Sequence, residues 1–360
     1  MKKNFKITAP TKKLMGTVAG VIVAYVIMEI LINTGHVSSL IQGLLVPVCI
    51  YSIAAVALNL CVGYLGELSL GHAGFMCIGA FSSAYFSKLN ADTMSDGPRF
   101  ILALLIGMVV SGVFGFLIAI PVLRLKGDYL AIVTLAFGEI IKNVMNVIYV
   151  GKDAQGLHFS AKDQFSLGMA TDGKMIINGA QGITGTPRQS TFTIGVILLI
   201  LALVITGNFV NSRTGRAVKA IRDNRIAAET VGLPVSRYKL IAFTLSAAIA
   251  GVAGVLYAHS LNSLTATTNN FGYNMSIMIL VYVVLGGIGN FSGGIIATTV
   301  LLLLPELLRG LADYRMLIYS IVLITLMIIN WSPDVLRWRA TKGLTADSIK
   351  AKFAKKKEVR

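Results

Sequence analysis

The chain has 360 residues, of which 55% are apolar and 13% are charged. Soluble domains average about 45–50% apolar and about 25% charged residues, so this composition excludes an ordinary soluble protein. The formal net charge is +16, but the basic residues are spread along the chain and not interleaved with aromatic residues on one face, which argues against nucleic-acid binding.

Ten apolar stretches predict membrane-spanning helices, since a helix needs roughly 20 apolar residues to cross the hydrocarbon. In chain order they are Leu14–Ile32, Leu40–Val62, Leu68–Phe86, Phe100–Leu123, Tyr129–Val150, Phe192–Val210, Leu240–Leu261, Phe271–Leu285, Gly293–Leu308 and Tyr314–Trp331. The eighth and ninth have only 15 and 16 residues and flank GGIGNFSGG, so they are either full crossings or a re-entrant pair. The sequence predicts an all-α polytopic bundle with one transmembrane domain, residues 14–331.

The positions of lysine and arginine predict the orientation of this domain. With the amino terminus inside the cell, segments 1–13, 124–127, 211–239 and 332–360 hold 23 basic residues, and the outer loops hold eight. Cytoplasmic loops of membrane proteins carry such an excess. We therefore expect basic cytoplasmic segments at both ends of the chain, and an uncleaved first span, because no clear small-residue cleavage site follows it.

The third predicted span begins in a polar, glycine-rich sequence, GYLGELSLGHAGF at residues 63–75. Gly66 and Gly71 free the backbone, while Ser69 and His72 need polar partners at membrane depth. A broken helix beside a translocation path accounts for this pattern, and so does a helix-packing site with Glu67 among lipid headgroups. His72 alone is more typical of a satisfied polar residue than of a substrate ligand.

The fifth predicted span carries Glu139 and Lys142, three residues apart and therefore on one face. A charge in hydrocarbon costs at least about 2.5–3.5 kcal/mol, so this face should point into the protein. The two side chains either line a pathway or form a neutralised pair that locks the bundle, and we favour the pair slightly.

The segment between the fifth and sixth spans, residues 151–191, is the only long outer loop. It is polar, with seven glycines and charges of both signs. A long loop without secondary structure is usually functional or disordered. It is therefore either a docking surface or a mobile spacer.

A charged segment, NSRTGRAVKAIRDNRIAAETVGLPVSRYK at residues 211–239, separates the sixth and seventh spans. Its small and apolar side chains recur at roughly helical spacing, and two oppositely charged pairs stand four residues apart; these are Ala217, Ile221, Ala228, Val231, Lys219/Asp223 and Arg225/Glu229. The pattern predicts one short amphipathic helix that stops at Gly232. On spacing alone, it is either a contact for a partner in water or a solvated linker near lipid headgroups.

Five stretches in the same order resemble the branched-chain amino acid ABC transporter permeases of the LivM type. They are GYLGELSLGHAGF, RLKGDYLAIVTLAFGEI (124–140), GAQGITGTP (179–187), residues 215–258 and VVLGGIGNFSGGIIA (283–297), and they cover most of the chain from Gly63 onward. In that family, the charged loop is a coupling helix that fits a groove on a cytoplasmic ATPase. The resemblance implies this role for Arg222, Asp223, Asn224, Ala227, Ala228, Glu229 and Gly232.

The resemblance also implies a setting and partners for the chain. It predicts a multi-pass protein of the bacterial inner membrane that pairs with a second homologous permease and with ATPase subunits, which use the ATP. An extracytoplasmic substrate-binding protein would dock on residues 151–191. The implied substrates are leucine, isoleucine and valine, although similar permeases move urea or short amides. Candidate residues of the translocation path are Gly66, Ser69, Gly71, His72, Glu139 and Lys142.

The sequence predicts no catalytic residue and no cofactor or metal site in this chain. No glycine run ends in Gly-Lys-Ser/Thr, and no His-Glu-x-x-His motif or Cys/His cluster occurs. An ion-coupled secondary transporter is the remaining alternative. Such transporters usually carry several inward ionisable residues near the midplane, and only Glu139 is well placed here.

Overall fold

The computed structural model describes residues 9–308, apart from 92, 126, 154, 155 and 170–172, together with seven single residues between 314 and 328. The predicted tenth span is thus described only in part, and the basic tail 332–360 and residues 1–8 lie outside the described residues. The chain divides into two compact units, Met1–Thr299 and Val300–Arg360. The first unit holds the helices from α1 to α11 and the beginning of α12.

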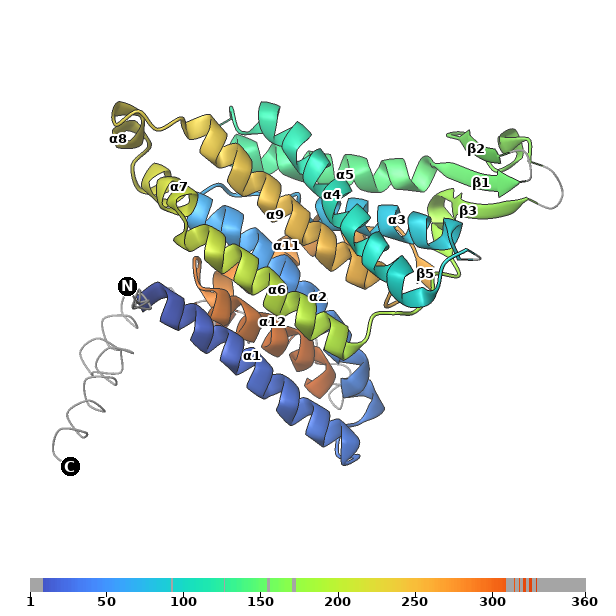
Figure 1. The fold of residues 1–360 in the computed structure, drawn as a ribbon, viewed down its shortest axis with the longest axis horizontal. Helices are drawn as coiled ribbons and strands as arrows, with labels where there is room; N and C mark the ends of the chain where they lie inside the picture. Colours follow the sequence, from blue (N-terminus) through green and yellow to red (C-terminus); the bar gives the residue numbers. More distant parts are fainter. Residues whose placement is uncertain are drawn as a thin grey trace, which may run out of the picture. The chain divides into compact units, whose positions relative to one another are not determined.

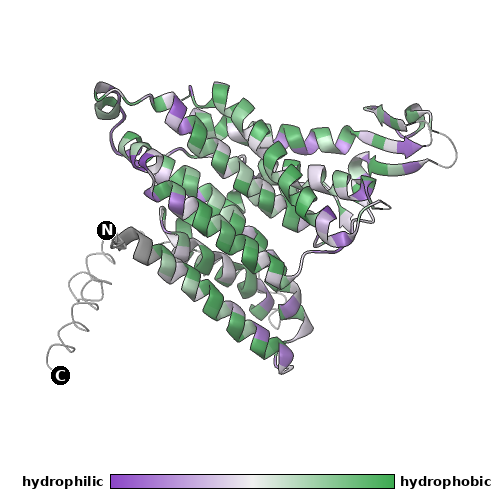
Figure 2. Ribbon diagram, viewed as in Figure 1, coloured by the Kyte–Doolittle hydropathy of each residue, from purple (hydrophilic) through white to green (hydrophobic). Residues whose placement is uncertain are grey.

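Long apolar helices make up most of the described chain (Figure 1). They are α1 (Ala9–Asn33), α2 (Ser39–Asn59), α3 (His72–Leu89), α4 (Asp96–Val122), α5 (Asp128–Val147), α6 (Phe192–Asn211) and α9 (Val235–Ala258). Within the described residues, six of these seven helices are long and apolar enough to cross a membrane, and α3 is the exception. The span that contains α2 also includes the π-helix η1 (Leu60–Leu65). Figure 2 shows these ribbons as mainly hydrophobic, and this composition agrees with a polytopic membrane protein.

The first nine predicted spans each correspond to a described helix, although their ends differ by up to five residues. The third span, expected to begin at Leu68, begins at His72, because residues 66–71 are not helical. The eighth and ninth are the short helices α11 (Tyr273–Gly286) and α12 (Phe291–Leu307). For α11 and α12, full crossing and a re-entrant pair both remain predictions.

Small side chains allow α3, α4 and α9 to pack closely at the centre of the bundle. The Ser111 hydroxyl on α4 lies 2.8 Å from the Ala247 carbonyl on α9 and 3.1 Å from the Phe75 carbonyl on α3. Phe75 also meets Phe243 of α9 edge to face, with ring centroids 5.7 Å apart. Lipid gives no hydrophobic drive for helices to associate, so close packing and hydrogen bonds of this kind hold such bundles together.

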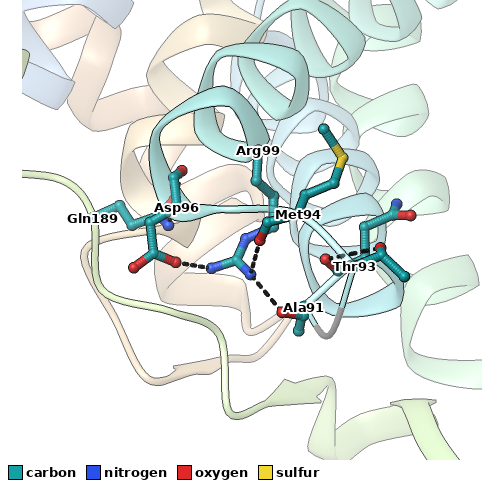
Figure 3. Close-up of polar contacts among 7 residues, drawn as sticks. Ala91, Thr93, Met94, Asp96, Arg99 and Gln189 are labelled. Atoms are coloured by element: carbon teal, nitrogen blue, oxygen red, sulfur yellow. Dashed lines mark hydrogen bonds and ion pairs between the residues drawn. The ribbon is translucent and has the colours of Figure 1, made fainter.

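A buried arginine fixes the turn between α3 and α4 (Figure 3). Arg99 is 4% exposed, and its guanidinium donates to the carbonyls of Ala91, at 3.1 Å, and Met94, at 3.5 Å. It also forms an ion pair with Asp96. The Gln189 side chain donates to the Asp96 carbonyl at 3.2 Å and thereby ties the segment before α6 to the same turn.

The all-α prediction is wrong for the outer loop, which contains a small sheet. The strands β1 (Tyr149–Asp153), β2 (Gly156–Ser160) and β3 (Lys174–Asn178) pair antiparallel in the order β2-β1-β3. A second pair joins β4 (Ile183–Thr184) to β5 (Ser263–Leu264), and the loop also holds the 3-10 turns η2 (Phe165–Leu167) and η3 (Gly179–Gln181). Val150 lies opposite Ile177, and both are buried, so these β-branched residues supply the apolar contact that a strand pair needs.

The charged segment forms two helices, not the single predicted helix. They are α7 (Arg213–Asp223) and α8 (Arg225–Thr230). Asn224 has an extended backbone, with φ −154° and ψ 104°, and its side chain caps α8 by accepting from the Ala227 amide at 3.0 Å. Asparagine is a preferred N-cap residue, and the cap explains why the helix restarts here. The predicted end at Gly232 is confirmed, since this residue follows α8 with φ +84°.

Candidate functional site

The solvent-exposed surface of the charged loop is centred on α8. Ile226 is 75% exposed and Val231 is 80% exposed. Beside them, Arg225 and Glu229 form an ion pair at 2.9 Å. An apolar patch rimmed by charges is typical of a protein contact surface.

The inner side of the same loop has a small core of its own. Ala228 is 5% exposed and packs with Ile221 and Val235, and Leu233 and Tyr238 cover this cluster. Of the seven residues expected to couple to a partner, Ala228 is therefore buried, while Arg222, Asp223, Asn224, Ala227, Glu229 and Gly232 are exposed. The short side chain of Ala228 serves packing inside the loop in this structure.

Arg222 points away from this surface and toward the break between α2 and α3. Its Nη1 donates to the Gly63 carbonyl at 2.7 Å, and its Nη2 lies 2.7 Å from Oδ1 of Asp223. The side-chain stem lies against Gly66, where a Cβ would be 2.6 Å from Cγ of Arg222. Gly66 also has φ +78°, so both its conformation and its surroundings require glycine.

The helix break also contacts the turn between α11 and α12. The Asn59 side chain accepts from the Gly289 amide at 2.8 Å, and the Tyr64 hydroxyl donates to the Gly289 carbonyl at 2.8 Å. The Lys219 ammonium of α7 lies 5.4 Å from the centroid of the Tyr64 ring. Burial lowers the pKa of Lys219, the neighbouring Arg222 and Arg216 lower it further, and Asp223 opposes them.

Three of the sequence stretches that carried the family resemblance therefore meet in one place. Residues 63–75 contain the break, residues 215–258 supply Arg222 and Lys219, and residues 283–297 supply Gly289. Helices with a π-helical turn such as η1 frequently have it at a functional site.

Glu67 and Lys239 form a second link between the break and the charged loop. Their side chains are an ion pair, and they are only 14% and 9% exposed. Lys239 is the last residue of the charged loop and lies near the start of α9. The expectation that Glu67 lies among lipid headgroups is therefore wrong, because a largely buried carboxylate needs a partner of opposite charge and finds it in Lys239.

Ser69 and His72 belong to a buried hydrogen-bond network between three helices. The Ser246 hydroxyl of α9 donates to the Ala57 carbonyl of α2 at 2.5 Å. Nε2 of His72 lies 2.7 Å from the same hydroxyl, so Nε2 donates to it. Nδ1 then accepts from the Ser69 hydroxyl at 3.1 Å. Both ring nitrogens are satisfied within the protein, as expected for a structural polar residue.

Glu139 and Lys142 point inward, as predicted, and they bind to a second place where a helix is interrupted. Lys142 Nζ lies 2.5 Å from Glu139 Oε2 and 3.2 Å from the Thr268 hydroxyl. The other carboxylate oxygen accepts from the Tyr273 amide at 2.7 Å. Thr268 begins α10 (Thr268–Phe271) and Tyr273 begins α11, so the pair binds α5 to the junction of these two helices.

Gly71 lies between the Ser69–His72 group and the Glu139–Lys142 pair, all predicted to line the translocation path. A Cβ on Gly71 would be 2.4 Å from the Thr134 carbonyl of α5, and the Thr134 hydroxyl accepts from the Leu70 amide at 3.0 Å. The Ser69–His72 and Glu139–Lys142 groups thus belong to α3 and α5, which touch at this point. No group of three or more His, Cys, Asp or Glu that could hold a metal occurs in the described part of the chain.

Several residues of these networks were not found from the sequence. Tyr64, Thr134, Ser246 and Thr268 each bond to a residue at least 64 positions away in the chain. The only sign in the sequence is that each is a polar group within or beside an apolar stretch. Their partners depend on which helices are neighbours, which a single sequence does not state.

Comparison with known proteins identifies the class to which this arrangement belongs. The family described as branched-chain amino acid transport system / permease component matches residues 40–330. The chain belongs to this family. It is a permease component, as the five ordered stretches predicted.

Individual relatives differ in what their names say they transport. The high-affinity branched-chain amino acid transport system permease protein LivM of Salmonella typhimurium is 35% identical over 294 residues, which cover 79% of this chain and 67% of that protein. The fructose import permease protein FruG of Bifidobacterium longum is 25% identical over 342 residues, 91% of this chain and 93% of FruG. The nucleoside ABC transporter permease protein NupC of Lactococcus lactis is 24% identical over 209 residues, 55% and 60% of the two chains. No solved structure shows a significant match.

Proposed function

We propose that this permease component imports leucine, isoleucine and valine as one half of the membrane channel of an ATP-binding-cassette importer. In this proposal, a second homologous permease supplies the other half, cytoplasmic ATPase subunits supply the energy, and this chain hydrolyses no ATP itself. Both termini and the α7–α8 loop lie in the cytoplasm. The distribution of basic residues supports that orientation.

The observation that carries the coupling proposal is the bond between Arg222 and the Gly63 carbonyl. The exposed patch of Ile226 and Val231 is the contact for an ATPase subunit. When the ATPase subunits bind nucleotide and close, they move α8 and α7, and Arg222 transmits this movement to η1. Through Glu67 and Lys239 the same movement reaches α9, so the ends of three helices shift together.

The proposed substrate rests on the similarity to LivM and on the partners of the polar side chains inside the bundle. The FruG and NupC relatives show that one family includes permeases with very different solutes in their names. Ser69, His72, Glu139 and Lys142 all have partners within the protein, which supports selection outside this chain. We infer that a substrate-binding protein selects the solute and docks at the outer loop 151–191. Import of urea or short amides is the alternative.

The same contacts weigh against ion coupling. Ion-coupled transporters need an ionisable group that can change its charge during the cycle. Both oxygens of the Glu139 carboxylate are engaged, one by Lys142 and one by the Tyr273 amide. This carboxylate therefore serves to fix a helix junction.

Replacing an exposed residue of α8 tests the coupling surface. Ile226→Asp should abolish co-purification of an ATPase subunit with the chain, because it places a charge in the apolar patch. Ala228 is unsuitable for this test, since it is buried inside the loop. The matched control is Phe165→Asp, at a residue that is 94% exposed on the outer loop and should leave co-purification unchanged. Undiminished ATPase binding by the Ile226→Asp chain would overturn the proposed surface.

Solute competition tests the substrate. With the cognate binding protein present, an excess of leucine, isoleucine or valine should suppress uptake of labelled leucine, while urea, acetamide and fructose should not. Competition by urea or acetamide at equal concentration would favour the alternative.

A further inference from the structure

A cavity of about 270 Å³ lies between the end of α4 and the start of α9. Its lining combines two kinds of side chain. Some are apolar, and the others carry two guanidinium groups and a hydroxyl; the lining residues are Ala119, Ile120, Leu123, Leu240, Arg124, Arg237 and Ser236. No feature of the coupling loop described above requires this cavity.

The two arginines of the cavity have no partner in the described part of the chain. Both side chains are exposed, and neither forms an ion pair or a side-chain hydrogen bond there. The first turn of α9, which contains Arg237, has no acidic residue. Two uncompensated positive charges at one cavity favour an anionic ligand, and guanidinium groups suit phosphate because they offer several donors in one plane.

The position of the cavity defines what kind of anion fits. Arg124 follows the last turn of an apolar helix, and Arg237 lies in the first turn of another. Ile120 and Ile241 near it are 45% and 40% exposed, as expected for side chains that face hydrocarbon. The cavity therefore lies at the ends of two apolar helices, beside apolar side chains that are exposed.

We propose that this cavity binds an anionic phospholipid of the inner leaflet. The lipid phosphate lies between Arg124 and Arg237 and accepts a hydrogen bond from Ser236, and the first carbons of an acyl chain cover Ile120 and Leu240. This inference rests on the proposed orientation of the chain. Basic pockets between helices on the cytoplasmic side of a membrane are suited to anionic headgroups.

A soluble phosphate or an acidic protein surface would satisfy only half of this site. Either would neutralise the arginines, but it would leave the apolar lining without a partner. A phospholipid carries the negative charge and the hydrocarbon in one molecule.

The bound lipid would stabilise the junction that the coupling loop moves. Its phosphate would bridge α4 and α9, and Arg237 is two residues before Lys239, which pairs with Glu67 of the helix break. α9 follows α8 with only residues 231–234 between them. Anionic lipid would therefore hold the start of α9 against α4 while α8 moves.

Lipid retention tests the proposal on the full chain with its accompanying subunits. The protein is placed in mixed vesicles of phosphatidylcholine and phosphatidylglycerol, purified in mild detergent, and its retained lipids are measured by native mass spectrometry. The double variant Arg124→Gln/Arg237→Gln should bind phosphatidylglycerol roughly 30-fold more weakly than wild type, since each basic side chain near anionic lipid contributes about fivefold. The matched control is Arg213→Gln, an exposed arginine of the charged loop that does not line the cavity, and it should retain the lipid like wild type.

The other outcomes are equally decisive. Equal retention by the double variant and wild type would overturn the proposal. Displacement of the lipid by inorganic phosphate would also overturn it, because the site would then be one for soluble anions. Loss of the ATPase subunit from the double variant, with lipid retained, would assign the arginines to a protein contact. Lipid retention is measured without ATP, so it can succeed even if the coupling test on Ile226 fails.

Discussion

Arg222 belongs to two structures at once, the charged loop and the break between α2 and α3. Its guanidinium contacts the Asp223 carboxylate and the Gly63 carbonyl through different nitrogens. Lysine has a single compact ammonium and cannot form both contacts with the same geometry. At the scale of one residue, the shape of the donor group is therefore what connects the two segments.

We expect Arg222→Lys to uncouple transport without removing the ATPase. The charge remains and the outward patch of Ile226 and Val231 is untouched, so the ATPase subunit should still co-purify. Substrate uptake by membrane vesicles should fall several-fold, because the bond to Gly63 is lost. The control is Arg216→Lys, since Arg216 donates to the Asn211 carbonyl and not to the break. If Arg222→Lys transports like wild type, the bond does not carry the movement.

Helix α8 has only six residues, which is too short for a helix to be stable by its own hydrogen bonds. It depends on its cap at Asn224 and on the packing of Ala228 against Ile221 and Val235. The element is thus held by a few local contacts. Such an element can keep its shape on a partner surface and can also lose its shape when one contact is removed.

Asn224→Ala should loosen α8 by about 0.5–2 kcal/mol, the usual contribution of an N-cap side chain. Hydrogen exchange of the amides of residues 225–230 should become faster, while exchange in α9 should not change. Asn224→Ser keeps an accepting oxygen and should exchange like wild type. Unchanged exchange in Asn224→Ala would show that packing alone holds α8.

In the whole bundle, polar contacts at the helix breaks add to the apolar packing. The break at residues 66–71 is tied to α9 by the Glu67–Lys239 pair, and the α10–α11 junction is tied to α5 by the Glu139–Lys142 pair. A helix break inside a membrane protein leaves backbone groups unpaired, and neighbouring helices must satisfy them. Glu139 does this for the Tyr273 amide and Thr134 does it for the Leu70 amide, while the members of each charged pair neutralise one another.

Glu139→Gln should destabilise the protein and leave transport by the folded fraction largely intact. Removing one member of a buried ion pair typically costs about 3–5 kcal/mol, because the other charge is left buried and alone. Thermal unfolding in detergent should therefore occur at a lower temperature. Glu139→Gln/Lys142→Met removes both charges and should recover part of the loss. Loss of uptake without any change in thermal unfolding would instead place Glu139 in the translocation path.

The sequence by itself determined the class of the protein. Apolar stretches of sufficient length, the basic segments between them and the ordered glycine-rich motifs are local properties, and they predicted the membrane helices and the family. The inward face of Glu139 and Lys142 was also predictable, because helical spacing and the cost of a charge in lipid leave little choice.

Only the tertiary structure decided how these parts are connected. The bonds of Arg222 to Gly63 and of Tyr64 to Gly289 depend on the packing of distant segments. The restart of the charged helix at Asn224 and the sheet in the outer loop depend on more local contacts, which helical periodicity also does not reveal. Helical periodicity states which face of a helix is buried. It does not state which other helix covers that face, because many partners offer equally apolar surfaces, and the specific polar contacts form only after the helices have packed.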